Sequence, residues 1–498
     1  MISQKNKKLF ITTAIPYING EPHLGHVLEM VQADVVARYY RLLDYEVYFL
    51  SGTDENSLKN VRAAEIASLS IKDWVDRYYL KFYQLKDQFN FSFDDFIRTT
   101  ETRHIKGVQK LWLSCQKDIY KKTYTGLYCL DCEAFYKEEE LINGLCPEHK
   151  KPLELISEEN YFFRLSKYQD TLIKIIETEQ LKIIPQTRKN EILSFLKSGL
   201  EDICISRSVS RSRGWGIPVP NDSSQIVWVW FDALSNYINA LGYATDSKLF
   251  NKWWQKNPFT LHIIGKGISR FHAVYWPAML LSAGLKLPSQ IFVHGYITLG
   301  KEKMGKSSGS PIKPADLLSK YSVDTLRYFL LREIPAYEDG EFKEERVIDR
   351  YQKDLASGLG NLFARVSALA EKSGQPILLK ENDLKSDIDK VIKNYHLFMA
   401  DYRFHEALAQ LWSLINKADS YINDQKPWSK SGNKSEFEKN ISSLVIVLYY
   451  LAKWLLPFLP KTASEILKRL SLEKIKENNL IGQKIKLKKG EPLFPKLA

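Results

Sequence analysis

The chain has 498 residues, of which 44% are hydrophobic and 26% are charged. At about 150 residues per domain this length predicts roughly three domains, and the composition excludes an intrinsically disordered chain. Five cysteines are too few, and an odd number, for a disulfide-stapled secreted scaffold. The net charge of +12, from 71 Lys and Arg against 59 Asp and Glu, weakly favours a polyanionic partner such as nucleic acid.

Strand and helix patterns alternate over the first 118 residues. Residues 10–14 predict a short buried strand, and the turn-rich segment PYINGEP follows it. Apolar residues then recur at helical spacing from Leu24 to Leu42, and residues 46–50 predict a second strand. Such alternation is typical of a parallel sheet with helices on its faces.

The sheet pattern is expected to be interrupted by an insertion and then resumed. Clustered cysteines and the arginine-dotted segment ISRSVSRSRGWGIPVP follow residue 119, and strand-like runs return at IVWVWF, TLHIIG and QIFVHGY. Beyond about residue 320 the strands are expected to stop. Residues 351–470 predict amphipathic helices, and the Lys-rich final stretch predicts a tail folded back on the body.

The most apolar stretch, residues 444–459, has the sequence LVIVLYYLAKWLLPFL. Lys453 interrupts it and Pro457 would break a helix, so we expect a buried core helix rather than a membrane span. No targeting signal stands out at the N-terminus.

Two histidines flank a short segment where a strand and a turn give way to a helix, in the string His23-Leu-Gly25-His26. A helix N-terminus offers backbone N–H groups and a positive dipole end, which suit phosphate. Imidazoles can add hydrogen bonds while the glycine permits close approach. The alternative is that both histidines only cap or pack the helix.

A cationic loop lies after the last predicted strand of the sheet, in the segment GKEKMGKSSGS. Lys303 and Lys306, between glycines, can close on developing phosphate charge. Alone, this segment is more typical of a solvated basic loop. It indicates a phosphate site only because the same chain also has the histidine string and a helical C-terminal third.

The spacing C-x2-C-x13-C-x2-H predicts a structural zinc site in the insertion. Two short-spaced pairs joined by a turn at Asn143 and Gly144 can place four ligands tetrahedrally. The alternative is chance clustering of reduced cysteines. The predicted ligands are Cys129, Cys132, Cys146 and His149.

The chain resembles the methionyl-tRNA synthetase family of class I enzymes, in the subgroup with a single zinc knuckle. The matching blocks run in the family's order: ITTAIPYINGEPHLGH, SGTDEN, WGIPVP, VWFDALSNY, FHAVYWPAM and HGYITLGKEKMGKS. The chain departs from the family at Gly305, where Ser is usual, and at Gly267, where an Asp associated with the ATP ribose is usual. We still expect activity, because both histidines and both loop lysines are present.

The resemblance implies an α/β fold: a Rossmann-like parallel-sheet catalytic domain, interrupted by a zinc-knuckle insertion and followed by an all-α helix bundle. The expected segments are the first catalytic half (1–118), the insertion (119–222), the second catalytic half with the lysine loop (223–320), a linker (321–350) and an anticodon-binding domain (351–498).

The resemblance also implies the reaction, in which methionine is activated with ATP and transferred to tRNA(Met), initiator and elongator, with Mg²⁺ accompanying the ATP. It assigns catalysis to His23, His26, Lys303 and Lys306. It assigns ATP binding to His23, Gly25, His26, His294, Gly295 and Lys306. It assigns methionine binding to Ala14, Ile15, Tyr17, Asp54, Trp230, Ala233, Leu234, Tyr237, His272 and Trp276. Taken singly, each of these aromatic residues is more typical of core.

Two basic features suggest where tRNA would bind. Arg207, Arg211 and Arg213 could face the acceptor stem, although a solvated basic face is equally expected. Asn361 and Arg365 lie at i and i+4 on one predicted helix face, which alone is more typical of surface decoration. The resemblance places Asn361, Arg365 and Trp428 at the CAU anticodon, where bases are read by hydrogen bonds and stacking.

Other functions are open at this stage. One is another nucleotidylyltransferase or a synthetase for cysteine, leucine or valine; another is a non-catalytic tRNA-binding paralogue, supported only by Gly267 and Gly305. Small transferases lack the helical domain, and the leucine and valine enzymes carry larger insertions. A cytoplasmic monomer is expected.

Overall fold

The computed structural model describes residues 7–129, 134–148, 150–245, 247–300, 302–303, 311–374, 376–380, 382–430 and 433–495. The chain divides into two compact units: Met1–His294 with Met304–Pro314, and Gly295–Lys303 with Ala315–Ala498. The five segments predicted from the sequence are finer than this division and stay a prediction.

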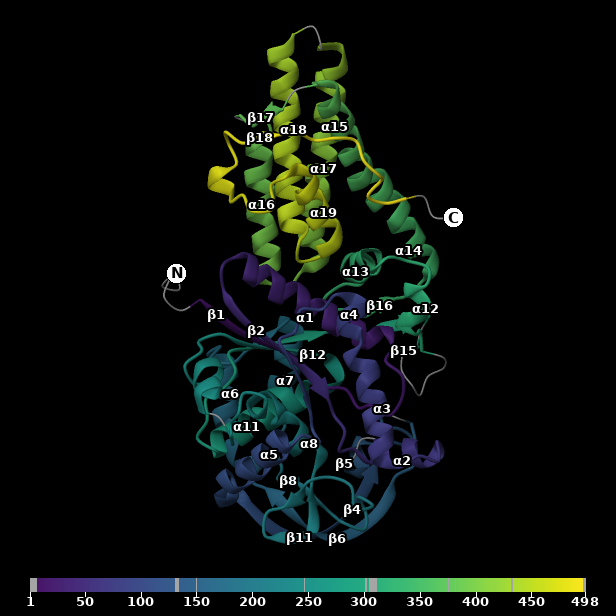
Figure 1. The fold of residues 1–498 in the computed structure, drawn as a ribbon. Coiled ribbons are helices and arrows are strands. Elements are labelled where there is room, and N and C mark those ends of the chain that lie inside the picture. Colours follow the sequence, from purple (N-terminus) through teal and green to yellow (C-terminus); the bar gives the residue numbers. More distant parts are fainter. Residues whose placement is uncertain are drawn as a thin grey trace. The chain divides into compact units, whose positions relative to one another are not determined.

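The first unit is built on a six-stranded sheet in the order β3-β2-β1-β12-β13-β7, and every neighbouring pair is parallel (Figure 1). The prediction of a parallel sheet is therefore confirmed. Its strands are β1 (Lys8–Thr13), β2 (Glu46–Thr53), β3 (Asp95–Arg98), β7 (Lys182–Ile184), β12 (Thr260–Gly265) and β13 (Gln290–His294).

The strand order reverses direction between β1 and β12. From β1 the chain continues to β2 on one side, whereas β12 and β13, which follow the insertion, lie on the other side. In such sheets ligands bind in the crevice at the carboxyl ends of the strands, at this switch point. Strands β1, β2, β12 and β13 all end at that edge, because they are parallel.

Local sequence explains the central elements. Leu9, Phe10 and Ile11 are fully buried, and an unbroken apolar run is typical of a parallel strand covered on both faces. Helix α1 (Leu24–Leu42) buries the predicted positions Leu24, Val27, Leu28, Val31, Val35 and Tyr39. It packs on β1, β2 and β12.

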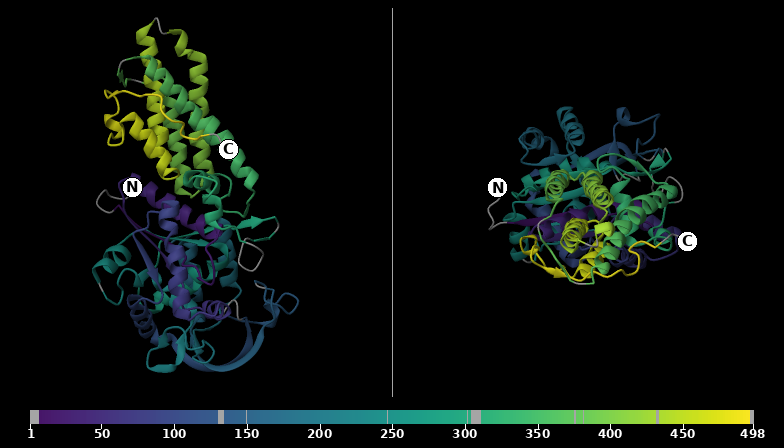
Figure 2. Two further views of the ribbon diagram at one scale, coloured as in Figure 1. Left: turned by 45° about the vertical axis from the view of Figure 1, so that its right-hand side comes forward. Right: turned by 90° about the horizontal axis from the view of Figure 1, so that it is seen from above.

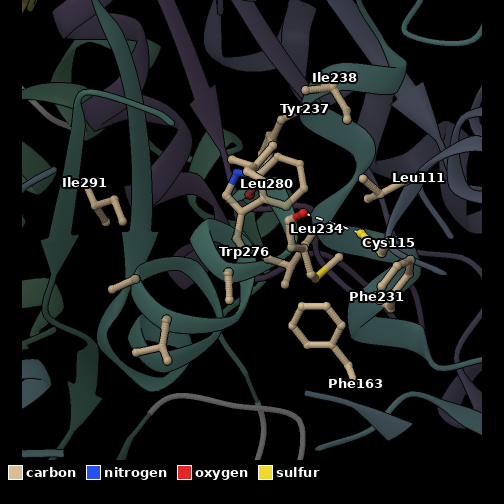
Figure 3. Close-up of a cluster of buried hydrophobic side chains, with 14 of the residues drawn as sticks. Leu111, Cys115, Phe163, Phe231, Leu234, Tyr237, Ile238, Trp276, Leu280 and Ile291 are labelled. Carbon is tan, nitrogen blue, oxygen red and sulfur yellow. Dashed lines mark hydrogen bonds between the residues drawn. The ribbon is translucent and has the colours of Figure 1, made fainter. Parts of the chain in front are cut away.

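Further helices of the first unit surround the sheet, and α5, α8 and α11 meet in a hydrophobic cluster (Figure 3). In it the ring of Trp276 in α11 lies 6.1 Å from that of Tyr237, and the ring of Phe231 in α8 lies 5.4 Å from that of Trp112 in α5, measured between centroids. The helices are α2 (Leu58–Ile66), α3 (Ile71–Tyr83), α4 (Leu85–Phe89), α5 (Thr102–Ser114), α6 (Gln169–Glu177), α7 (Gln186–Lys197), α8 (Val229–Leu234), α9 (Asn236–Asn239), α10 (Ser247–Phe250) and α11 (Trp276–Ser282).

The insertion forms two small antiparallel sheets, ordered β5-β4-β6-β8 and β10-β11-β9. Their strands are β4 (Ile119–Cys129), β5 (Ala134–Tyr136), β6 (Glu154–Phe163), β8 (Ile203–Cys204), β9 (Ser206–Ser208), β10 (Pro218–Val219) and β11 (Asp222–Val227).

One predicted strand is wrong in part. The run IVWVWF divides, because β11 ends at Val227 and α8 begins at Val229, with Trp228 in extended conformation between them. A short continuous apolar run is common to buried strands and buried helices, so periodicity could not separate the two.

The second unit is mainly helical, and α16, α17 and α18 run alongside one another (Figure 1 and Figure 2). Its helices are α12 (Pro314–Leu318), which begins at the unit boundary, α13 (Val323–Arg332), α14 (Glu344–Arg350), α15 (Asn361–Lys372), α16 (Lys385–Ala400), α17 (Phe404–Gln425), α18 (Lys434–Leu455) and α19 (Pro460–Leu470). A π-helical stretch, Tyr351–Gly360, joins α14 to α15.

The expectation that strands stop near residue 320 is wrong for three short strands. β16 (Gly340–Glu341) pairs with β14 (Ile297–Leu299), which also pairs with β15 (Glu302–Lys303). β17 (Ile377–Leu378) pairs with β18 (Lys484–Ile485), so the C-terminal tail does fold back. Two-residue strands leave no periodic signal in a sequence.

The apolar stretch at residues 444–459 contains the buried C-terminal half of helix α18, so the predicted core helix is confirmed. Leu444, Val445 and Leu448 of α18 are buried, and the helix ends at Leu455, ahead of Pro457. Among the described residues, none of the helices has both the length and the apolar character needed to cross a membrane.

Candidate active site

The two histidines of the HLGH string lie at the start of α1, at the switch point of the sheet. His23 caps the helix in extended conformation, and its backbone N–H donates to Nδ1 of His26 at 3.1 Å. The rings stack with centroids 3.7 Å apart. Because Nδ1 of His26 accepts, the neutral ring carries its proton on Nε2, where it is a donor.

A side chain at Gly25 would be tight against the ring of His23. A Cβ built there would lie 3.0 Å from both Cε1 and Nδ1 of His23, closer than ordinary contact. The glycine therefore allows the ring of His23 to lie close to the backbone at the positive end of the helix.

His294 ends β13 at the same edge of the sheet. Its Nε2 lies 3.0 Å from Oε2 of Glu29 in α1, and both side chains are mostly buried. No sequence pattern singled out Glu29, although it lies one helical turn after His26. Gly295 begins the second unit, where an added Cβ would lie 2.1 Å from the carbonyl oxygen of Glu338, so packing alone requires glycine there.

The lysine loop falls largely outside the described residues. The backbone of Lys303, in β15, pairs with that of Thr298, in β14. Met304, Gly305, Lys306 and Ser307 are not among the described residues. The expected roles of Lys303 and Lys306 stay predictions.

Asp54 follows β2 directly and is 3% exposed. Its backbone forms a bridge to Tyr17, and its N–H donates to the carbonyl of Pro16 at 2.9 Å. The carbonyl of Asp54 accepts from Nδ2 of Asn60 at 2.9 Å. The residue predicted to bind the ammonium, Asp54, and one predicted aromatic wall, Tyr17, are thus paired through their backbones.

The partly exposed residues of the predicted methionine pocket come from two segments. Ala14, Ile15 and Tyr17 follow β1, and Trp230 lies in α8. Tyr17 and Trp230 meet edge to face at 6.4 Å between ring centroids. Trp230 also stacks on Phe271 at 3.7 Å, a neighbour that the sequence did not indicate.

Tyr237 and His272 form a buried hydrogen-bonded pair. Nδ1 of His272 lies 3.0 Å from the carbonyl of Ile268, so it carries the proton, and Tyr237 Oη donates to Nε2 at 2.7 Å. Burial lowers the pKa of His272 to about 4 and raises the pKa of Tyr237. The ring is therefore neutral near pH 7.

The other predicted pocket residues are buried in this structure. Ala233, Leu234 and Trp276 are at most 4% exposed, and Figure 3 shows Tyr237 beside Trp276 within the hydrophobic cluster. The structure thus brings the predicted pocket together in one region, with one part open and one part packed as core.

Two of the four predicted zinc ligands are described. Cys129 ends β4 and Cys146 follows the predicted turn, in which Asn143 and Gly144 have positive φ. Both thiols are buried, whereas Cys132 and His149 lie outside the described residues. Among described residues, no cluster of three or more His, Cys, Asp or Glu is arranged to hold a metal.

The predicted anticodon residues lie in the second unit. Asn361 and Arg365 share a face of α15, and Trp428 is 48% exposed. Arg365 is held by Asp419 at 2.6 Å and by Asn423 at 2.8 Å, both in α17. The sequence did not indicate these partners, because the contact joins helices about 55 residues apart in the chain.

The arginine cluster of the insertion is not a shared solvated face. Arg207 is 7% exposed and donates to the carbonyl of Ser206 at 2.7 Å. Arg211 lies over the ring of Tyr128 at 4.2 Å. Arg213 is exposed and pairs with Glu65.

Comparison with known proteins identifies the family. The family model for class I tRNA synthetases (M) matches residues 9–155 and 149–367, and that for the anticodon-binding domain of tRNA ligase matches residues 381–491. The methionine–tRNA ligases of Thermotoga maritima and Bacillus subtilis are each 39% identical over 98% and 99% of this chain, and over 80% and 78% of their own lengths. The chain belongs to the methionyl-tRNA synthetase family. It is thus an aminoacyl-tRNA synthetase, and the resemblance seen in its sequence is confirmed.

A solved member of the methionyl-tRNA synthetase family has the same fold. The Mycobacterium tuberculosis methionyl-tRNA synthetase, in complex with methionyl-adenylate, superposes with a TM-score of 0.92 at 36% identity. The match covers 98% of this chain and 100% of that chain. The predicted fold class, a parallel-sheet α/β domain followed by a helical domain, is confirmed.

Proposed function

We propose that this chain activates L-methionine with ATP, giving methionyl-adenylate and pyrophosphate, and transfers methionine to the 3′-terminal adenosine of tRNA(Met). The proposal includes both initiator and elongator tRNA. The observation that supports it most is the stacked His23–His26 pair at the N-terminus of α1, which lies at the same sheet edge as Asp54 and the aromatic pocket.

The first step needs no general base, because the methionine carboxylate is already an anionic nucleophile. It attacks the α-phosphorus of ATP, a P–O bond forms, and the bond to pyrophosphate breaks. The protein must align the two reactants and stabilise charge on the phosphates. The Nε2–H of His26 and the N-terminus of α1 supply donors for this purpose, and Lys303 and Lys306 supply positive charge.

Methionine is held at two ends in this proposal. Asp54 binds the α-ammonium, and Tyr17 and Trp230 line the side chain, whose polarizable thioether suits aromatic surfaces. Neutral His272 orients the hydroxyl of Tyr237, because its Nε2 can only accept. Binding the side chain at depth requires Trp276 or Tyr237 to move from the packed positions seen here.

ATP is proposed to bind with Mg²⁺ held mainly by phosphates and water. His23, Gly25, His26, His294, Gly295 and Lys306 are the proposed contacts. Glu29 fixes His294 by its 3.0 Å hydrogen bond. Gly267 offers no carboxylate to the ribose, so we expect weaker ATP affinity than an Asp there would give, with activity retained.

A structural zinc ion fits the insertion. The buried thiols of Cys129 and Cys146, one at a strand end and one after a tight turn, are a donor chemistry that zinc prefers. With Cys132 and His149 they would complete four ligands, and the ion would contribute folding free energy rather than chemistry.

The second unit is proposed to bind the CAU anticodon through Asn361, Arg365 and Trp428. Asp419 and Asn423 hold the guanidinium of Arg365 in a fixed orientation, and the exposed indole of Trp428 is available for stacking on a base. A cytoplasmic monomer completes the proposal.

Pyrophosphate exchange across a panel of amino acids tests the function. Only methionine should support strong ATP–pyrophosphate exchange, and His26→Ala should abolish it while methionine binding persists. Strong exchange with cysteine, leucine or valine, or none with methionine, would overturn the proposal.

A further inference from the structure

A buried carboxylate joins two walls of the proposed methionine site. Asp232 lies in α8 and is 1% exposed. Its Oδ1 lies 2.5 Å from Nε2 of His104 in α5, and its Oδ2 accepts from Nδ2 of Asn56 at 2.8 Å. Both carboxylate oxygens are therefore used, each by a side chain from a different segment.

The carboxylate of Asp232 sets the proton position on His104. Nε2 of His104 faces Oδ1 of Asp232, which only accepts, so Nε2 carries the proton that is donated. Nδ2 of Asn239 lies 3.3 Å from both Nδ1 and the carbonyl oxygen of His104, and it donates to Ser235 Oγ at 2.7 Å. Gly107 permits this approach, since a Cβ there would lie 1.9 Å from Oδ1 of Asn239.

One end of this network reaches the loop that carries Asp54. Asn56 is two residues further along, and its amide also donates to the carbonyl of Thr99 at 3.1 Å. The N–H of Glu55, between them, donates to Thr99 Oγ1 at 2.8 Å. Asn56 thus fixes the loop directly after the proposed ammonium ligand.

The other end lies in the helix that carries the side-chain wall. Asp232 is two residues after Trp230 and directly before Ala233, within one helical turn. A single carboxylate therefore sets the distance between the loop of Asp54 and the helix of Trp230. An apolar side chain could fill the same space but would carry no directional bonds.

We propose that Asp232, together with Asn56 and His104, is a positioning group that fixes Asp54 relative to Trp230, so that the ammonium and the side chain of methionine bind at once. This inference rests on the proposed function, because it takes Asp54 as the ammonium ligand. None of the three residues contacts methionine in the proposal; each acts through Asp54 or Trp230.

The test measures affinity for two ligands that differ only in the amine. One is a sulfamoyl analogue of methionyl-adenylate, and the other is its counterpart without the α-amino group. Asn56→Ala should weaken the first at least 10-fold, equivalent to about 1.4 kcal/mol, and the second less than 2-fold. Isothermal calorimetry on the full chain gives both constants.

Asn257→Ala is the matched control. Asn257 is fully buried, whereas Asn56 is partly buried, and its amide likewise donates two hydrogen bonds, to carbonyls at 3.1 and 3.0 Å, but it precedes β12 at the opposite edge of the sheet. It should lower the melting temperature about as much as Asn56→Ala and change neither affinity. Equal weakening of both ligands by Asn56→Ala, or weakening of neither, would overturn the proposal.

Two further variants separate the possible failures. Asp232→Asn keeps an oxygen that accepts from His104, but it places an NH2 donor opposite the donating amide of Asn56. It should therefore reproduce the amine-selective loss of affinity even where Asn56→Ala folds poorly. A loss common to both ligands would count against the network. Asp54→Asn tests the proposed function by itself: without an amine-selective loss, the ammonium assignment fails, whatever Asn56→Ala does.

Discussion

Acid should weaken the first unit through its buried neutral histidines, His262 and His272, and His272 is the one whose contribution can be worked out. The pKa of His272 is lowered from its ordinary 6.5 to about 4, because the ring is buried. Between these two values the unfolded chain binds a proton that the folded chain does not, so stability falls as the pH falls. The contribution is fully present above about pH 6.5 and is lost progressively down to about pH 4.

The magnitude follows from the two pKa values. Their difference corresponds to about 3.4 kcal/mol in full, at 1.36 kcal/mol per pKa unit. About 2 kcal/mol of this is lost between pH 7.5 and pH 5.0. Protonation would also set a second N–H of His272 against the hydroxyl of Tyr237, which now donates to Nε2.

The assay compares wild type with His272→Gln by urea unfolding at the two pH values. Tryptophan fluorescence reports on the first unit, which holds eight of the 11 tryptophans. The variant should be less stable at pH 7.5, because glutamine fits less well against Ile268 and Tyr237. Between pH 7.5 and pH 5.0, however, its free energy of unfolding should fall by about 2 kcal/mol less than that of wild type. Asp222, whose pKa is lowered by Ser224 and Lys121, contributes equally to both proteins. An identical loss in both would refute the reasoning.

Three further outcomes are expected. Gly25→Ala presses a Cβ against the His23 ring and should lower the kcat of pyrophosphate exchange about 10- to 100-fold with methionine binding unchanged; an unaltered kcat would contradict the positioning role. Cys129→Ser should release zinc, measured by metal analysis, and increase amide hydrogen exchange in the insertion. Full activity together with unchanged hydrogen exchange would contradict the zinc assignment. Trp428→Ala should cripple aminoacylation and spare pyrophosphate exchange, whereas equal loss of both would argue against anticodon stacking.

The hydrogen bonds of Arg365 show why contacts between residues distant in the chain could not be predicted from the sequence. The i, i+4 spacing of Asn361 and Arg365 predicted their shared face correctly. It could not indicate Asp419 and Asn423, because these residues approach Arg365 only when α17 packs beside α15. The same holds for Glu29 and His294, which are 265 residues apart in the chain.

The run IVWVWF shows a different limit. Its apolar character correctly predicted burial, but burial is common to the end of β11 and the start of α8. The turn between them leaves Trp228 buried and Trp230 partly exposed, and thereby decides which indole can line a pocket. Composition and hydrophobic pattern carry no information on such a change of direction.

The sequence by itself determined the elements whose signals are local: the buried strand before the HLGH string, the helix that follows it, the resumed parallel sheet and the helical C-terminal part. Hydrophobic periodicity and turn chemistry depend only on near neighbours in the chain, so they can be read without a structure. The tertiary structure alone decided that Asp232 joins Asn56 to His104 and that Tyr237 donates to His272. Hydrogen bonds between distant segments depend on distances of a few tenths of an ångström, and only packing sets these.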